Sequence, residues 1–157
     1  TLAEKQAIRH WLHAKLGAAL DDSLGSCFMR DRRIARIVAD AICHFDEERY
    51  LLYAWCVMPN HVHVVLSISE GVHLDQVMHS WKSFTSNSAN RVLGRRGSFW
   101  QDDYFDRSLR DGRELQETVA YVLNNPRAMG DWPFVAAYGE RLAHFTADVA
   151  GREVRRR

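Results

Sequence analysis

The stretch MPNHVHVVL, residues 58–66, joins a turn to an apolar run that two histidines interrupt. Pro59 and Asn60 are typical turn residues, and short apolar segments flank them at residues 51–58 and 61–68. This pattern predicts two antiparallel strands that form a hairpin.

The two histidines lie on the same face of the second strand, because side chains alternate along a strand. His61 and His63 share that face with Val65 and Ser67, and the opposite face is apolar, with Val62, Val64, Leu66 and Ile68. Two imidazoles so placed can chelate one metal ion and leave positions for water or substrate. An isolated H-x-H is also typical of a hydrogen-bonded surface pair, and Cys56 is a candidate third ligand for zinc. The pair alone therefore leaves its role open.

The composition is that of an ordinary soluble globular protein: 157 residues fit one domain, 46% of them hydrophobic and 26% charged. No apolar run approaches the ~20 residues of a membrane span, and no signal-peptide pattern opens the sequence. Cys27, Cys43 and Cys56 are odd in number and lack C-x-x-C spacing, which indicates a reducing cytoplasm. Most of the 21 basic residues are arginines, which suit phosphate, although a GC-rich genome is the simpler explanation of that bias.

Apolar periodicity predicts four helices, at residues 4–20, 31–45, 74–93 and 111–126. Asp31 and Asp111 are expected N-caps, and Glu114 completes a capping-box pattern with Asp111. Residues 98–109 are aromatic and typical of an extended segment, whereas the chain beyond residue 132 is less patterned. The order of helices and strands predicts an α+β protein with an antiparallel sheet.

The last predicted helix carries a tyrosine away from its apolar stripe, which consists of Leu115, Val119, Val122 and Leu123. At about 100° per residue, Tyr121 lies roughly 130° from the centre of that stripe. Asn125 follows one turn later, in a polar row with Glu117. Because Asn125 precedes Pro126, we expect non-helical backbone there and an amide that reaches outward as a ligand for a hard divalent ion. Taken alone, the run Asn124-Asn125-Pro126 is better read as a helix stop.

H-V-H on a strand, followed about sixty residues later by Y-V-L-N-N-P on a helix, resembles the HUH single-tyrosine transposases. Within that group the chain is most similar to the REP-associated tyrosine transposases. The segments WCVMPNHVHVVL, HSWKSFTSNSANRVLGRRGSFWQDDYFDRSLRD and AYVLNNP follow in family order and cover roughly residues 28–130. We therefore expect a single domain over residues 1–157, with residues 131–157 as a C-terminal extension.

The resemblance implies a ferredoxin-like α+β fold and a cytoplasmic, metal-dependent DNA endonuclease and strand transferase. By this resemblance His61 and His63 match the histidines that bind Mg²⁺ or Mn²⁺, Tyr121 matches the nucleophile, and Asn125 matches a third metal ligand. The implied partner is single-stranded or hairpin DNA with REP-like palindromes, and the implied intermediate is a 5′-phosphotyrosine beside a free 3′ hydroxyl. The family sheet begins with an N-terminal strand that nothing before Leu2 supplies, so we expect that strand to be missing.

Candidate DNA contacts, through backbone phosphates or base stacking, are Lys82, Ser83, Thr85, Ser86, Arg91, Arg95, Arg96 and Trp100. Trp81 lies on an apolar stripe and is expected in the core. Two other functions stay open: a catalytically silent hairpin-binding protein derived from a transposase, and a zinc-binding protein unrelated to DNA. The sequence leaves both a monomer and a homodimer open.

Overall fold

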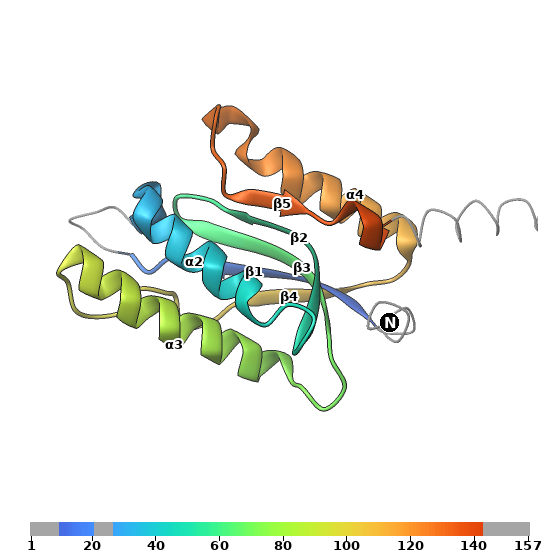
Figure 1. Ribbon diagram of the computed structural model, residues 1–157, viewed down its shortest axis with the longest axis horizontal. Coiled ribbons are helices and arrows are strands. Elements are labelled where there is room, and N and C mark those ends of the chain that lie inside the picture. The colour runs from blue at the N-terminus through green and yellow to red at the C-terminus, as the bar shows by residue number, and fades with distance from the viewer. Residues whose placement is uncertain (1–9, 21–26, 143–157) are drawn as a thin grey trace, which may run out of the picture.

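The computed structural model describes residues 10–20 and 27–142, which form a five-stranded antiparallel sheet with helices on both faces (Figure 1). The strands are β1 (Trp11–Gly17), β2 (Tyr50–Val57), β3 (His61–Ile68), β4 (Phe105–Leu109) and β5 (Val135–Ala137), in the order β4-β1-β3-β2-β5. The helices are α2 (Arg32–His44), α3 (Leu74–Leu93) and α4 (Gly112–Asn124), with 3-10 turns η1 (Phe28–Arg30) and η2 (Asn125–Met129). The predicted α+β class, with a ferredoxin-like antiparallel sheet, is confirmed. In the described ranges, no helix has the length and apolarity to cross a membrane.

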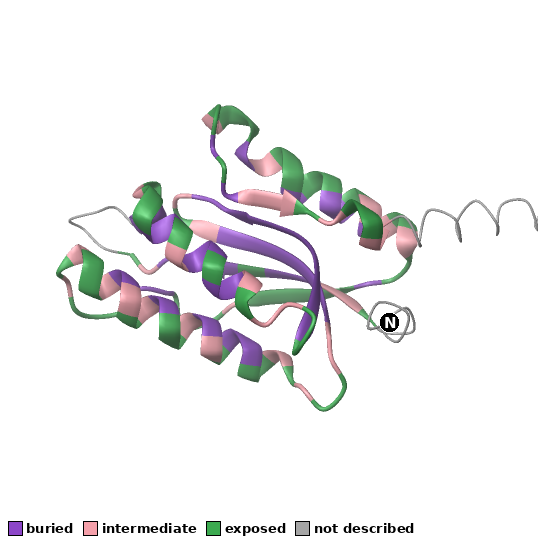
Figure 2. Cartoon of the chain, viewed as in Figure 1, coloured by how far each residue is buried: buried purple, intermediate pink, exposed green. Residues whose placement is uncertain are grey.

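The predicted hairpin is confirmed as β2 and β3, and β3 separates two hydrophobic cores. Val62, Val64 and Leu66 point into the larger core, which α2 and α3 cover. Val65 points the other way, into a smaller core under α4. Figure 2 shows the result: β2 and β3 are buried for most of their length, whereas β4 at the sheet edge is mostly exposed.

The expected helix at residues 4–20 is wrong where the structure describes it, because Trp11–Gly17 is strand β1 and pairs with both β3 and β4. Residues 4–9 of that prediction lie outside the described residues. Leu12 and Leu16 are four apart, a spacing that places two residues on one face of a helix and also on one face of a strand. Ala14 lies between them and is fully buried in the larger core, as alternation requires. The expectation of a missing first strand is corrected too, since β1 occupies that place.

The helix caps follow the sequence closely. The Asp31 side chain accepts from the Arg33 amide at 2.9 Å, and Asp111 accepts from the Glu114 amide at 2.9 Å. Glu114 does not close the predicted capping box with Asp111; its Oε2 accepts from the Arg110 amide at 2.8 Å, one residue earlier. β5 was not predicted, because three residues are too few for a periodic signal. It extends the sheet with part of the expected C-terminal extension.

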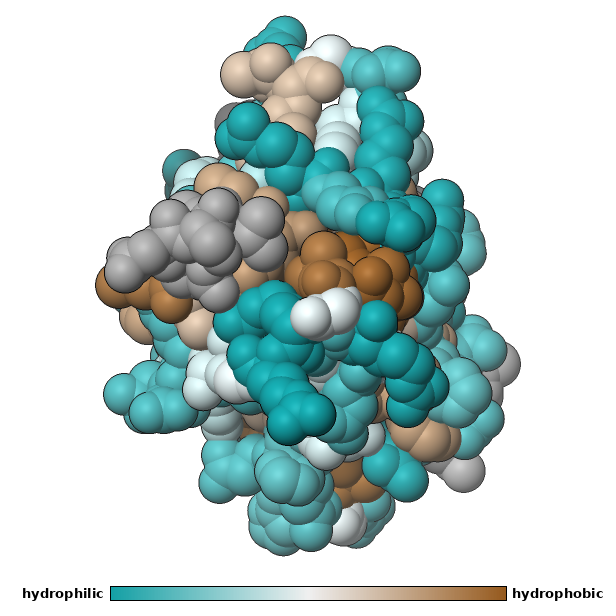
Figure 3. All heavy atoms as spheres, turned by 90° about the vertical axis from the view of Figure 1, so that its left-hand side faces the viewer, coloured by the Kyte–Doolittle hydropathy of each residue, from teal (hydrophilic) through white to brown (hydrophobic). Residues whose placement is uncertain are grey.

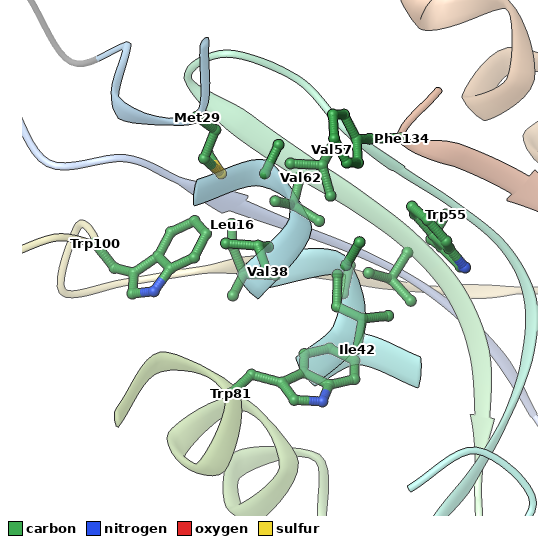
Figure 4. Close-up of a cluster of buried hydrophobic side chains, with 14 of the residues drawn as sticks. Leu16, Met29, Val38, Ile42, Trp55, Val57, Val62, Trp81, Trp100 and Phe134 are labelled. Atoms are coloured by element: carbon green, nitrogen blue, oxygen red, sulfur yellow. The ribbon is translucent and has the colours of Figure 1, made fainter. Parts of the chain in front are cut away.

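Figure 4 shows part of the larger core, in which Trp81 and Trp100 lie among aliphatic side chains. Buried polar contacts also link α3 to its surroundings there. Trp81, predicted in the core, is buried and donates from Nε1 to the Tyr50 hydroxyl at 3.2 Å. The Thr85 hydroxyl donates to the Trp81 carbonyl at 2.6 Å and accepts from Trp100 Nε1 at 2.8 Å. Thr85 is 1% exposed and Trp100 is 6% exposed. The prediction that these two side chains contact DNA is therefore wrong, because both are enclosed in the core.

We expect Thr85→Val to lower the free energy of unfolding by about 1–3 kcal/mol, because it leaves the buried Trp100 indole N–H without an acceptor. Urea denaturation followed by tryptophan fluorescence measures this loss. Ser83→Ala, an exposed position on the same helix, is the matched control and should change stability by no more than about 0.5 kcal/mol. Equal stability of Thr85→Val and the parent would contradict the buried hydrogen bond.

Candidate active site

The site lies on the face of the sheet that α4 covers, where three strands present same-face side chains. Lys15 on β1 is directly opposite His63 on β3, and His13 is opposite Val65. On the other side of β1, Lys15 is opposite Phe105 and His13 is opposite Arg107 on β4. Opposed residues of antiparallel strands have side chains on the same face. β1 therefore adds a histidine and a lysine beside the predicted pair.

His63 is held by a second histidine that the sequence analysis did not identify. The Nδ1 atom of His63 lies 2.9 Å from Nε2 of His13, and both side chains are buried. Burial lowers the pKa of His63 to about 3, and the charges of His61, His13 and Lys15 act in the same direction. Burial likewise lowers the pKa of His13, assisted by Arg107 and Lys15. Both rings are consequently neutral at neutral pH, the form in which imidazole binds metals.

His61 lies at the start of β3 with its ring centroid 4.9 Å from that of His63. Its Nδ1 atom is 2.6 Å from Oδ1 of Asn60. Burial and the charge of Lys15 lower the pKa of His61, whereas a hydrogen bond with the Asn125 side chain raises it. Asn125 therefore lies within hydrogen-bond distance of His61, and the prediction that both are ligands of one metal ion stays a prediction.

Tyr121 lies beside these rings, although its side chain is 56% exposed. Its ring centroid is 5.4 Å from that of His63 and 6.3 Å from that of His13, in edge-on geometry. α4 is held above the sheet by its apolar stripe, which packs into the smaller core with Leu115, Val119 and Val122. Leu123, expected on that stripe, is 40% exposed, and Thr118 is buried in its place. The buried Thr118 hydroxyl keeps a hydrogen-bond partner, because it donates to the Glu114 carbonyl at 2.8 Å.

The backbone at Asn125 differs from the prediction. Its φ of −56° and ψ of −47° are helical, so the chain continues from α4 into η2 without a break. Pro126 occupies an early position of η2, where a missing N–H costs little, and its ring is buried. Asn125 is therefore positioned by continuous helix rather than by a frayed end, one turn beyond Tyr121.

A cavity of about 610 Å³ opens between α4 and the β1–β4 side of the sheet. It is lined by His13, Lys15, His63, Phe105, Arg107, Glu114, Glu117, Thr118 and Tyr121. Glu117 and Tyr121 line it together, as expected from their shared helix row. The nucleophile candidate and one metal-ligand candidate thus face the same space.

The donor set at this site fits a divalent cation. His63 engages Nδ1 with His13, which leaves its Nε2 for a ligand, the arrangement usual for metal-binding histidines. His61 engages Nδ1 with Asn60 and is also hydrogen-bonded to the Asn125 side chain. Residues 10–20 and 27–142 contain no group of three His, Cys, Asp or Glu side chains placed for a metal. Asn125 is the third ligand that the family resemblance predicts. Cys56 is opposite His63, but burial raises the pKa of its thiol to about 12.

The remaining predicted DNA contacts lie along α3 and the loop after it, in the layer beyond the larger core. Lys82 is engaged within the protein and donates to the carbonyls of Gln101, Asp102 and Asp103 at 2.8, 3.0 and 3.4 Å. Arg95 donates to Oδ1 of Asn90 at 2.8 Å. Ser83, Arg91 and Arg96 are exposed, and Ser86 and the three arginines line or border a shallow hollow of about 550 Å³. Figure 3 shows one end of the molecule as mainly hydrophilic, with apolar patches between the polar side chains.

Sequence reasoning missed His13 and Lys15 because both were assigned to a helix. The available signal was alternation: His13 and Lys15 are two apart, as are His61 and His63, and apolar residues separate them. Read with period two, residues 11–17 predict a strand with a polar, titratable face.

The structure thus combines an antiparallel sheet, two histidines on one strand and a tyrosine on the helix beside them. The family model described as "Transposase IS200 like" matches residues 30–125, and the chain belongs to this family. A curated relative, the REP-associated tyrosine transposase of Escherichia coli (strain K12), is 25% identical over 106 residues, which cover 63% of this chain. The matched part spans 62% of that relative's length.

Comparison of structures gives the same fold. The solved structure of a REP-associated tyrosine transposase bound to a REP hairpin superposes with a TM-score of 0.61 at 18% sequence identity. The alignment covers 82% of this chain and 77% of that one. The resemblance drawn from the sequence motifs is confirmed.

We expect His13→Ala to weaken Mn²⁺ binding about 10- to 100-fold, the usual effect of removing the partner of a metal-binding histidine. Isothermal titration calorimetry measures this affinity directly. His13→Gln retains a polar side chain that can hydrogen-bond Nδ1 of His63 and should restore part of the loss. His79→Ala, which removes an exposed histidine on α3, should bind like the parent. An unchanged affinity in His13→Ala would show that His13 does not position His63.

Proposed function

We propose that this protein is a metal-dependent endonuclease and strand transferase that acts on single-stranded or hairpin DNA. The observation that carries the proposal is the position of Tyr121, whose ring lies 5.4 Å from that of the neutral His63 within one open cavity. A nucleophile and a cation site must meet at the same phosphate for the reaction to proceed. Family membership and the hairpin bound by the structural relative support the choice of DNA as substrate.

In the proposed reaction the Tyr121 oxygen forms a bond to phosphorus and the bond from phosphorus to the 3′ oxygen breaks. The phenol proton is lost, the 3′ oxygen gains a proton, and the 5′ phosphate stays covalently attached to the tyrosine. This phosphotyrosine conserves the bond energy, so that another 3′ hydroxyl can displace Tyr121 without ATP. His61, His63 and Asn125 would hold Mg²⁺ or Mn²⁺, which supplies polarisation of the non-bridging phosphate oxygens.

The proposed reaction also needs a neutral metal ligand and access for the DNA strand. Burial keeps His63 neutral, which spares the site a competing positive charge on the ligand itself. The open side of the cavity lets a strand enter, because Tyr121 is more than half exposed. The same exposure lets the phosphotyrosine wait for the acceptor strand.

We expect Tyr121→Phe to abolish covalent adduct formation with hairpin DNA in Mn²⁺, because it removes the attacking oxygen and keeps the ring. Denaturing gel electrophoresis with a labelled oligonucleotide detects the adduct. Tyr138→Phe, which removes a hydroxyl beside β5 at the opposite edge of the sheet, is the matched control and should retain the adduct. An adduct in Tyr121→Phe would exclude Tyr121 as nucleophile. Hairpin binding by the parent without any adduct in Mg²⁺ or Mn²⁺ would favour the catalytically silent binding protein.

We also propose that exposed arginines after the middle of α3 contact the DNA backbone. Arg91→Gln and Arg96→Gln should each reduce the slope of log affinity against log salt by about 0.7–0.9, since each phosphate contact releases counterions. Fluorescence anisotropy with a hairpin over a series of salt concentrations measures the slope. Arg49→Gln, an exposed arginine that packs over Phe45, serves as the control. Identical slopes in all variants would place the hairpin elsewhere.

A further inference from the structure

The β1–β4 side of the cavity carries side chains that the proposed reaction does not use. Lys15 and Phe105 are the two that stand out, because they form a row with His63 across three strands. Lys15 is opposite His63 in one ladder and opposite Phe105 in the other. Directly opposed Cβ atoms lie about 4.5–5.5 Å apart. The row therefore runs from the candidate metal ligand to the exposed edge of the sheet.

Lys15 is an exposed ammonium that lacks an ion-pair partner within the part of the chain that the structure describes. The neighbouring cation in the cavity is already paired, since Arg107 Nη1 lies 2.8 Å from Oε1 of Glu114. The charge of Lys15 reaches the candidate metal site, because it lowers the pKa of His13, His61 and His63. Lys15 is thus the cation of this cavity that remains available for an anionic ligand.

Phe105 is a large aromatic side chain left in solvent at the edge strand. It is 54% exposed, and its ring lies edge-on to His13 at a centroid distance of 6.4 Å. Exposed aromatic rings beside basic groups are the usual platform on which single-stranded bases stack. The protein core does not need this ring, because Phe105 belongs to neither hydrophobic core.

We propose that Lys15 and Phe105 form a subsite for a nucleotide of the single strand that flanks the scissile phosphate. The Lys15 ammonium contacts a backbone phosphate, and the Phe105 ring stacks on the adjoining base. The row places this nucleotide on the β4 side of His63, so that the strand crosses the sheet toward its open edge. The subsite rests on the proposed function and specifies how the substrate strand leaves the reacting phosphate.

The test uses the Tyr121→Phe protein in EDTA, so that neither cleavage nor metal affects binding. Fluorescence anisotropy compares a hairpin that carries a single-stranded extension with the same hairpin without it. We expect the extension to tighten binding, and Phe105→Ala to weaken binding of the extended hairpin roughly 5- to 150-fold. Lys15→Gln should lower the salt slope for the extended hairpin by about 0.7, the value for one phosphate contact on a single strand. Binding of the hairpin without the extension should not change.

Two control variants match the chemical changes. Phe84→Ala removes a phenylalanine of similar exposure, 58%, from α3, and Arg36→Gln removes one exposed charge from α2. Both should bind the extended hairpin like their parent, and Lys15→Arg should restore the salt slope that Lys15→Gln loses. The subsite would be overturned if each variant weakened binding of the two hairpins to the same extent, or if neither variant changed binding of either hairpin.

The outcome also separates the subsite from the catalytic proposal. An extension-dependent loss in Phe105→Ala, together with no adduct from the protein that retains Tyr121, would support the subsite and overturn the chemistry. Adduct formation with unchanged binding in both variants would overturn the subsite alone. Failure of the Tyr121→Phe protein to bind either hairpin, together with no adduct from the protein that retains Tyr121, would overturn both.

Discussion

The alternation of side chains along β3 is the constraint on which both layers of the molecule depend. β3 lies in the middle of the sheet and is buried on both faces, so each residue must serve one layer or the other. Val62, Val64 and Leu66 hold the layer of α2 and α3 in place. His61 and His63 take positions on the other face, where apolar residues would pack as well. Their neutral state there is a consequence of burial, because low polarity disfavours an imidazolium.

The sequence predicted correctly those parts of the fold whose local residue pattern is compatible with only one kind of secondary structure. The β2–β3 hairpin has a turn between two short apolar runs, and α4 has an Asp111 cap and a long apolar stripe. β1 failed this condition, because the spacing of Leu12 and Leu16 fits a helix and a strand equally well. The alternation of His13 and Lys15 with apolar residues favours the strand, and pairing with β3 and β4 establishes it.

The sequence identified candidate catalytic and metal-binding residues only on the helices and strands that it also predicted correctly. His61, His63, Tyr121 and Asn125 come from the hairpin and α4, and the structure brings the histidine and tyrosine rings together. His13 and Lys15 were lost with β1. Thr85 and Trp100 show the converse error: a hydroxyl and an indole look suited to DNA, yet inside the core the indole N–H donates to the hydroxyl, which donates to the Trp81 carbonyl. Residue type does not reveal which polar groups are already hydrogen-bonded within the folded protein.

Because α4 continues into η2 without a break, Tyr121 and Asn125 are held on one rigid segment. Tyr121 and Asn125 lie one turn apart on a single helical segment, and the apolar stripe of that segment attaches it to the smaller core. A tilt of this segment away from the sheet therefore moves the phenol and the amide together. Under the proposed function, withdrawal of the Tyr121 phenol from the phosphate would also withdraw Asn125 from the cation, which would link attack to metal coordination.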